Sequence, residues 1–325
     1  MSDPMSDPPA GPRRFGRAGS TLFFDPAGTP VAEVADGERF LVETADSACG
    51  LAKREAPRGW AIGELVDRLG GACPLTGPFH VAGARPGDAL LVRIHDVRLD
   101  PARGTAWTAV FGGFGALAAE RYTLQPGFQP ETRLLPYGGG VARLPVTGRD
   151  VGLPLRPFLG TVGVAPARER RMTFSQDPEY LGDVDLPALG AGAELVLPVN
   201  VDGALLALGD GHAAQGDGEI TGAAVEVECV ADVSVRVCGR DQVGYVSLPQ
   251  LNTDRWIGSV AGLQGGGLTD CARAAYADLA RRLIRHHGLS RNDAYLLLGQ
   301  AGRLRVGNMI DPFYSVLASI DRRYL

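Results

Sequence analysis

Residues 209–219 read GDGHAAQGDGE, and no other stretch of the chain says as much about its fold. The apolar run ALLAL at 204–208 precedes it, and the alternating run AAVEVE at 223–228 follows it. Two such runs around a glycine-rich polar segment predict a strand, a tight loop and a second strand. The loop would bring three acidic side chains and one imidazole to a single place.

Two interpretations of these side chains are open. Carboxylate and imidazole groups held together suit a divalent cation or a general acid–base pair. Alternate residues of an extended strand face the same side, so Asp210 goes with His212 and Asp217 with Glu219, and the two pairs could meet across the loop. The simpler alternative is an Asp/Gly hairpin whose acids only cap turns.

Several blocks of sequence resemble one enzyme family. The 209–219 stretch resembles the GD-x-HA-x-QGDGE signature of the acetamidase/formamidase family of amide hydrolases. Further resemblance lies in LTGP at 75–78 with VAGARPGD at 81–88, and in RPFLG at 156–160 with GVAP at 163–166. The resemblance extends from about residue 30 to the C-terminus. It implies a β-rich composite fold and the hydrolysis of a small linear amide to a carboxylate and ammonia.

The charge balance limits the classes of partner. The chain of 325 residues has 32 basic and 37 acidic residues, for a net charge of -5. This argues against nucleic acid or an anionic membrane as a partner, and the apolar runs are too short to span a bilayer. The 45 glycines and 23 prolines are dispersed, which is typical of many short strands joined by tight turns. We therefore expect a globular protein with a small-molecule substrate.

The five cysteines form no CxxC pair, and the N-terminal residues contain no apolar signal region. Both features predict reduced thiols and a cytoplasmic location. We also expect the protein to be a homo-oligomer. Cys73 has no motif histidine near it in the sequence, so we interpret it as a small core residue rather than as a nucleophile.

The succession of runs predicts a mainly β (α+β) fold with a β-sandwich-like or barrel-like core. We expect a disordered tail at 1–20, a β-rich catalytic core at 21–250 and a C-terminal α/β portion at 251–325 packed on that core. Asp36 and Gly37 predict a hairpin-type turn. Strands are predicted at 31–34, 39–44, 89–97, 105–111, 160–164, 194–201 and 230–237, and helices at 269–286 and 291–299.

The resemblance also implies roles for individual residues. We expect a divalent metal ion, zinc rather than calcium, and its candidate ligands are Asp46, Asp185, Asp210 and His212. Glu219 is the expected general acid–base group, and His212 and Asp217 are further catalytic candidates.

The YLGDVD block at 180–185 resembles the family's HGGN-x-D block and supplies the candidate substrate-binding residues Tyr180, Gly182 and Asp183. Gly182 and Asp185 match that pattern, whereas Tyr180 replaces a histidine, Leu181 a glycine and Asp183 an asparagine. A carboxylate in place of a neutral amide removes two hydrogen-bond donors and adds a negative charge. These departures favour a substrate other than formamide or acetamide.

Two alternatives to a formamidase-like activity therefore stay open. The first is an amidohydrolase of the same fold that acts on a larger or charged amide in specialised metabolism. The second is a non-enzymatic β scaffold that binds calcium alone. His212 and Glu219 argue against the scaffold, because a structural calcium loop prefers all-oxygen ligands.

Overall fold

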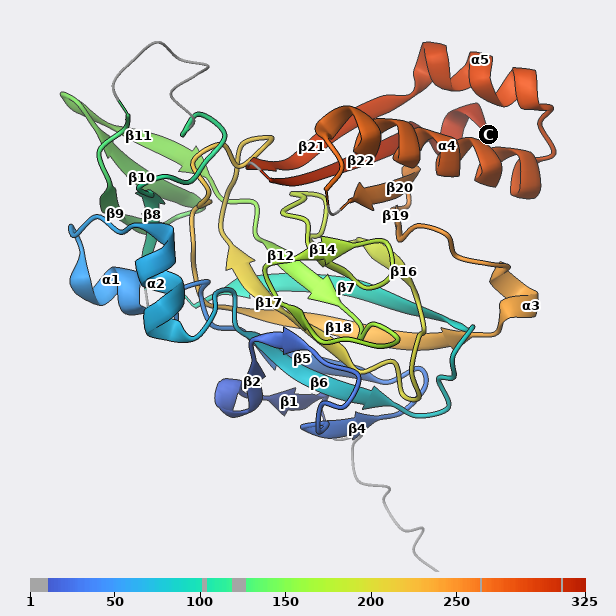
Figure 1. Ribbon diagram of the computed structural model, residues 1–325, viewed down its shortest axis with the longest axis horizontal. Helices are drawn as coiled ribbons and strands as arrows, with labels where there is room; N and C mark the ends of the chain where they lie inside the picture. The colour runs from blue at the N-terminus through green and yellow to red at the C-terminus, as the bar shows by residue number, and fades with distance from the viewer. Residues whose placement is uncertain (1–10, 101–103, 119–126, 264, 311) are drawn as a thin grey trace, which may run out of the picture.

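The computed structural model describes residues 11–100, 104–118, 127–263, 265–310 and 312–325. Two β-sheets lie face to face, and their inner side chains form the main hydrophobic core (Figure 1). This arrangement confirms the predicted mainly β, sandwich-like fold.

The larger sheet has nine strands in the order β1-β5-β18-β7-β16-β19-β20-β22-β21. Its long central strands alternate buried and partly exposed residues, as expected for a sheet with one covered face. The bounds are β1 (Arg13–Phe15), β5 (Arg39–Glu43), β7 (Ala89–Leu99), β16 (Glu194–Pro198), β18 (Cys229–Cys238), β19 (Gln250–Asn252), β20 (Trp256–Gly262), β21 (Arg303–Ile310) and β22 (Phe313–Asp321).

The second sheet has seven strands in the order β14-β15-β12-β17-β6-β2, with β4 also paired to β6. Its two central strands, β12 and β17, are buried along their whole length, so both faces of the sheet are covered there. The bounds are β2 (Ser20–Thr21), β4 (Ala32–Val34), β6 (Leu75–Val81), β12 (Phe158–Gly163), β14 (Gln176–Asp177), β15 (Leu181–Asp183) and β17 (Leu206–His212).

A smaller unit lies at one end of the sandwich, on the left of Figure 1. It is built around Trp60 and Trp107, which are almost completely buried. It contains α1 (Leu51–Glu55), α2 (Ile62–Leu69) and a four-stranded sheet of β8 (Thr105–Val110), β9 (Glu131–Gly138), β10 (Val141–Val146) and β11 (Arg149–Pro154). A two-stranded sheet joins β3 (Phe23–Phe24) to β13 (Arg171–Met172).

The C-terminal helices cover the outer end of the large sheet. The helix α4 (Leu268–His287) packs on β20 and β22, and α5 (Arg291–Ala301) packs on α4. Ser290 caps α5 by accepting a hydrogen bond from the Asp293 amide, and Gly288 ends α4 in the left-handed conformation. Both predicted helices are therefore present. A short α3 (Arg240–Val243) follows β18.

Three local expectations differ from the structure. Residues 11–20 are not a free tail, because β1 pairs with β5 and Phe15 packs against Phe40 and Phe79. The turn at Asp36 and Gly37 is present, but β4 pairs with β6 and β5 pairs with β18, so the two strands belong to different sheets rather than to a hairpin. Residues 223–228 form isolated bridges rather than a regular strand.

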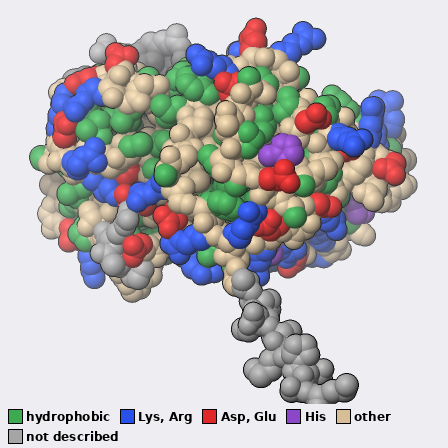
Figure 2. Space-filling model, turned by 90° about the horizontal axis from the view of Figure 1, so that it is seen from below, with side chains coloured by type: hydrophobic (Ala, Val, Ile, Leu, Met, Phe, Trp, Pro, Cys, Tyr) green, Lys and Arg blue, Asp and Glu red, His purple; other side chains and the backbone are tan. Residues whose placement is uncertain are grey.

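The surface shown in Figure 2 mixes acidic, basic and apolar side chains without separating the two signs of charge. Among the helices of the described ranges, none combines the length and the apolar character needed to cross a membrane.

Candidate active site

A cavity of about 100 Å³ lies where the C-terminal end of β17 meets α2 and β8. One wall carries apolar side chains from α2, β8 and the loops around them. The other wall is polar and consists of Ser47, Cys73, Asp183, Asp185, Asp210, His212, Glu219, Glu226 and Asn308. Residues far apart in the sequence therefore meet in one small space.

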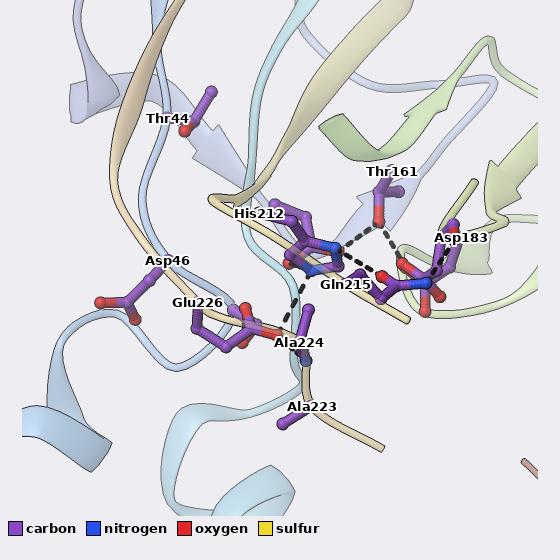
Figure 3. A network of polar contacts seen from close by, with 12 residues as sticks. Thr44, Asp46, Thr161, Asp183, His212, Gln215, Ala223, Ala224 and Glu226 are labelled. Carbon is purple, nitrogen blue, oxygen red and sulfur yellow. Dashed lines mark hydrogen bonds and ion pairs between the residues drawn. The ribbon is translucent and has the colours of Figure 1, made fainter. Parts of the chain in front are cut away.

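Strand β17 supplies the first pair of predicted residues, of which Figure 3 labels His212. Asp210 and His212 face the same side of the strand, as their spacing predicts, and both are about 98–99% buried. The Nε2 atom of His212 lies 3.4 Å from Asp210 Oδ1 and 3.3 Å from Glu226 Oε1. The imidazole is thus placed between two carboxylates.

Gly160 on β12 provides the space in which this group converges. Strand β12 pairs with β17 so that Thr161 lies opposite Gly209 and Leu159 opposite Gly211. A Cβ atom at position 160 would lie 2.6 Å from Asp185 Oδ1 and 2.8 Å from His212 Cε1, and closer still to Asp210 Oδ2. Only a residue without a side chain therefore allows the three groups to meet.

Gln215 orients the imidazole. Its Nε2 donates hydrogen bonds to the carbonyl oxygens of Asp185 at 2.7 Å and Gly307 at 3.0 Å. With both donors used in this way, its Oε1 faces His212 Nδ1 at 3.1 Å and accepts a hydrogen bond from it. Nδ1 thus carries a proton, and Nε2 points at the carboxylates.

Thr161 and Asn308 connect the remaining acids. Thr161 Oγ1 lies 2.5 Å from Asp183 Oδ1 and 3.1 Å from Asp210 Oδ2. Asn308 Nδ2 donates a hydrogen bond to Asp185 Oδ2 at 2.9 Å. These bonds fix the directions in which the carboxylates point into the cavity.

The cavity holds more acidic groups than basic ones. Burial raises the pKa of Asp183, Asp185 and Glu219 well above the ordinary carboxyl range, and neighbouring carboxylates raise it further. Among the described residues that line the cavity, none is Lys or Arg. Five carboxyl groups therefore share a single imidazole as their basic partner.

The pair formed by His212 and Asp210 behaves differently. Burial lowers the pKa of His212, but the negative charges of Glu226 and Asp210 outweigh burial and raise it well above the ordinary value. Burial alone would raise the pKa of Asp210, whereas the nearby imidazolium lowers it below the usual value. Without another cation, the two groups form a buried ion pair.

The polar wall fits a divalent cation. Asp210 Oδ1 and Asn308 Oδ1 are buried and accept no hydrogen bond, although a buried oxygen normally has a partner. Ligand atoms of Asp185, Asp210 and His212 lie within 4.8 Å of one another, as do those of His212, Glu219 and Glu226. One nitrogen with several carboxylate oxygens suits zinc better than calcium.

The structure separates Asp46 from the other predicted metal ligands. Figure 3 shows it beyond Glu226, on the far side from Asp183. Its carboxylate accepts hydrogen bonds from the amides of Ala48 at 3.1 Å and Gly50 at 2.8 Å, and Lys53 Nζ lies at 3.2 Å. Asp46 therefore caps the turn that leads into α1 through Oδ1, while its Oδ2 accepts no hydrogen bond and has Lys53 as its ion-pair partner.

Asp217 also lies outside the cavity. It is partly exposed and forms a two-pronged ion pair with Arg305 at 2.6 and 2.7 Å. Its predicted convergence with Glu219 does not occur, because the chain turns at Gly218, which has a φ of 89°. Of that pair, only Glu219 points into the cavity.

The three predicted substrate-binding residues, Tyr180, Gly182 and Asp183, also do not all lie at the cavity. Asp183 lines the cavity, but Tyr180 is buried beside Phe24 with its hydroxyl 2.8 Å from Ser175 Oγ. At Gly182 an added Cβ would overlap the carbonyl oxygen of Ser175, so this glycine serves backbone packing. Of the three predicted substrate-binding residues, only Asp183 therefore lines the cavity.

Sequence reasoning missed Glu226, Gln215 and Asn308, and it assigned Cys73 to the core. Cys73 instead lines the cavity, although burial raises the pKa of its thiol well above the ordinary value, which disfavours a thiolate nucleophile. Gln215 and Glu226 had a signal, since the first lies within the GDGHAAQGDGE stretch and the second in the alternating run after it.

Comparison with known proteins supports the geometric description. The sequence matches the acetamidase/formamidase family over residues 23–181 and 167–315. The crystal structure of an acetamidase from Bacillus halodurans is 31% identical, with a TM-score of 0.82, over 96% of this chain and 98% of that one. An acetamidase structure from Yersinia enterocolitica is 28% identical, with a TM-score of 0.85, over 97% and 94% of the two chains.

A Schizosaccharomyces pombe protein that bears the name formamidase is 29% identical over 192 residues. That match covers 45% of this chain and 47% of the relative, so the chain spans about half the length of this curated relative. The family match and the full-length structural similarity lead to one conclusion: the chain belongs to the acetamidase/formamidase family.

Proposed function

We propose that the chain hydrolyses a small linear primary amide to a carboxylate and ammonia with the help of a divalent metal ion. The observation that carries this proposal is the convergence of Asp185, Asp210 and His212 over Gly160, next to two further buried glutamates. Family membership gives the reaction class, and this cluster supplies the groups the reaction needs.

The metal ion, zinc rather than calcium, would be held by Asp185, Asp210 and His212. When bound, it supplies Lewis acidity that polarises the amide carbonyl and lowers the pKa of water. His212 would offer Nε2 to it, because Gln215 holds the proton on Nδ1. The cation would also favour the ionised form of the carboxyl groups around it, whose pKa is raised by burial.

Glu219 is the general acid–base group in this proposal. It takes a proton from the attacking water while the new C–O bond forms at the carbonyl carbon. It then gives the proton to the amide nitrogen as the C–N bond breaks, so ammonia leaves and the carboxylic acid stays behind. The second proton of the water passes from this acid to ammonia, which gives the carboxylate and ammonium. Asp183 faces the same space, where a carboxylate oxygen can accept a hydrogen bond from the amide NH₂ group.

Two buried aspartates make a matched test. Asp210→Asn should lose most bound zinc and lower kcat by about 10²-fold or more, since it removes a charged ligand. Asp46→Asn should keep both, because Asp46 lies outside the cavity. Elemental analysis and ammonia release, each with and without chelator, provide the two measurements. Equal loss in both variants, or full turnover by metal-free protein, would contradict the proposal.

The same assay addresses the calcium-binding scaffold, which predicts bound calcium and no ammonia release from any amide. We further propose a cytoplasmic location, because all five cysteines are free thiols. The proposed homo-oligomer is tested by sedimentation of the purified protein.

A further inference from the structure

The apolar wall of the catalytic cavity contains two aromatic pairs. Phe111 and Phe114 follow β8, with ring centroids 6.1 Å apart in an edge-on arrangement. Phe174 and Phe313 form a similar pair at 6.3 Å on another part of the wall. The side chains of α2 that line the cavity are apolar as well. A substituent carried by the substrate would therefore contact hydrocarbon once its amide group faces the carboxylates.

Phe111 and Phe114 have a second hollow on their other side. That hollow measures about 440 Å³ and is lined by both rings together with Leu117, Phe128 and Ile220. Among the described residues, Phe111 and Phe114 are the only aromatic side chains that line both the catalytic cavity and this hollow. The two rings are thus a partition between a cavity of about 100 Å³ and a larger apolar space.

The partition is fixed in place by its surroundings. The Gly112 amide donates a hydrogen bond to the carbonyl of Trp60 at 2.8 Å, and the Ala116 amide donates one to the carbonyl of Ile220 at 2.9 Å. Gly222 gives the Phe114 ring its room, since a Cβ there would lie 2.6 Å from Cδ1 of the ring. Both ends of the aromatic segment are therefore anchored, which favours a fixed wall over a mobile one.

The size of the cavity and the charges that line it together limit which substituent of the amide can bind. A cavity of about 150 Å³ is large enough to hold benzene, so the smaller cavity here suits a short acyl chain. A carboxylate on the substituent would meet an apolar wall or a wall with five carboxyl groups, and no described lining residue is a Lys or Arg that could pair with it. This combination favours a neutral, short aliphatic group.

We infer that the Phe111–Phe114 partition sets the upper size limit of the acyl group by separating the catalytic cavity from the hollow beyond it. This inference rests on the proposed amide hydrolysis. It makes Phe114 a specificity-determining residue with no part in the chemical step.

The test compares hexanamide with acetamide in wild-type protein and in Phe114→Ala. Removing the ring joins the two spaces, so the ratio of kcat/KM for hexanamide to that for acetamide should rise by about 10- to 100-fold. Phe114→Leu, a milder change, should give a smaller rise. Phe128→Ala is the matched control, because Phe128 lines only the hollow and is 52% exposed, and its ratio should stay within about twofold of wild type.

An unchanged ratio in the folded Phe114 variants, or an equal rise in Phe128→Ala, would overturn the inference. If wild-type protein releases ammonia from no amide, the proposed function fails. In that case the Kd values of hexanamide and acetamide are measured by calorimetry, and their ratio replaces the ratio of kcat/KM values. The role of the partition is therefore tested even if the proposed function fails.

Discussion

Replacing Gly160 by alanine should disable the site while leaving the fold intact. The backbone at Gly160 has no positive φ, so alanine meets no conformational obstacle there. The obstacle is space, because the new Cβ would lie 2.6 Å from Asp185 Oδ1, and ordinary contacts begin at 3.4 Å. Asp185 must therefore retreat by about 0.8 Å, and His212 and Asp210 must move as well.

The size of the effect follows from these displacements. A misplacement of about 1 Å in a catalytic group can lower the rate by about 10²-fold. We expect a loss of about 10²-fold in kcat/KM and of about 10- to 100-fold in zinc affinity. Forcing one methyl group into a packed region should also lower the free energy of unfolding by about 1–3 kcal/mol.

The assay is a competition for zinc against a chromogenic chelator, followed by ammonia release from acetamide. Gly138→Ala is the matched control, because this strand glycine has no atom within 4 Å of an added Cβ. Wild-type zinc affinity and turnover in folded Gly160→Ala would refute the argument that Gly160 makes room for the ligands.

Three other changes have distinct expected results. Gln215→Leu should lower zinc affinity by about 10- to 100-fold, because His212 loses the acceptor that fixes its proton on Nδ1; zinc titration measures this. Asp217→Ala should leave kcat within about twofold of wild type, since its partner Arg305 lies outside the cavity, and a large loss would return Asp217 to the active site. Asp232 has its pKa lowered by its hydrogen bond to Arg39, so the folded state gains stability above the unfolded pKa and loses it as the pH falls through the folded one. Asp232→Asn should therefore lower the free energy of unfolding by about 1 kcal/mol at pH 7, a modest value because the guanidinium is half exposed. The effect should shrink progressively as the pH falls from about 4 through the lowered pKa of Asp232, and urea unfolding over this pH range checks it.

Local patterns in the sequence were enough for some of the elements and for part of the site. Alternating and apolar runs located β7, β17 and β18 among the longest strands but not β9, β21 or β22, and the 3.6-residue spacing located α4 and α5. The strand spacing of Asp210 and His212 also placed both side chains on one face, and the structure shows both of them lining the cavity with His212 Nε2 3.4 Å from Asp210 Oδ1. These features depend on residues close together in the chain, so sequence alone determines them.

Which carboxylates join that pair was decided by the tertiary structure. Asp46 and Asp217 are of the right type, but the fold places Asp46 beside two amides and Lys53, and Asp217 beside Arg305, outside the cavity. Glu226 enters it from a segment without regular strand pairing. The physical reason is that a carboxylate binds whichever donors or cation the fold places within about 3 Å. That placement depends on the register of β12 against β17 and on the empty space above Gly160, which neighbouring residues in the sequence do not specify.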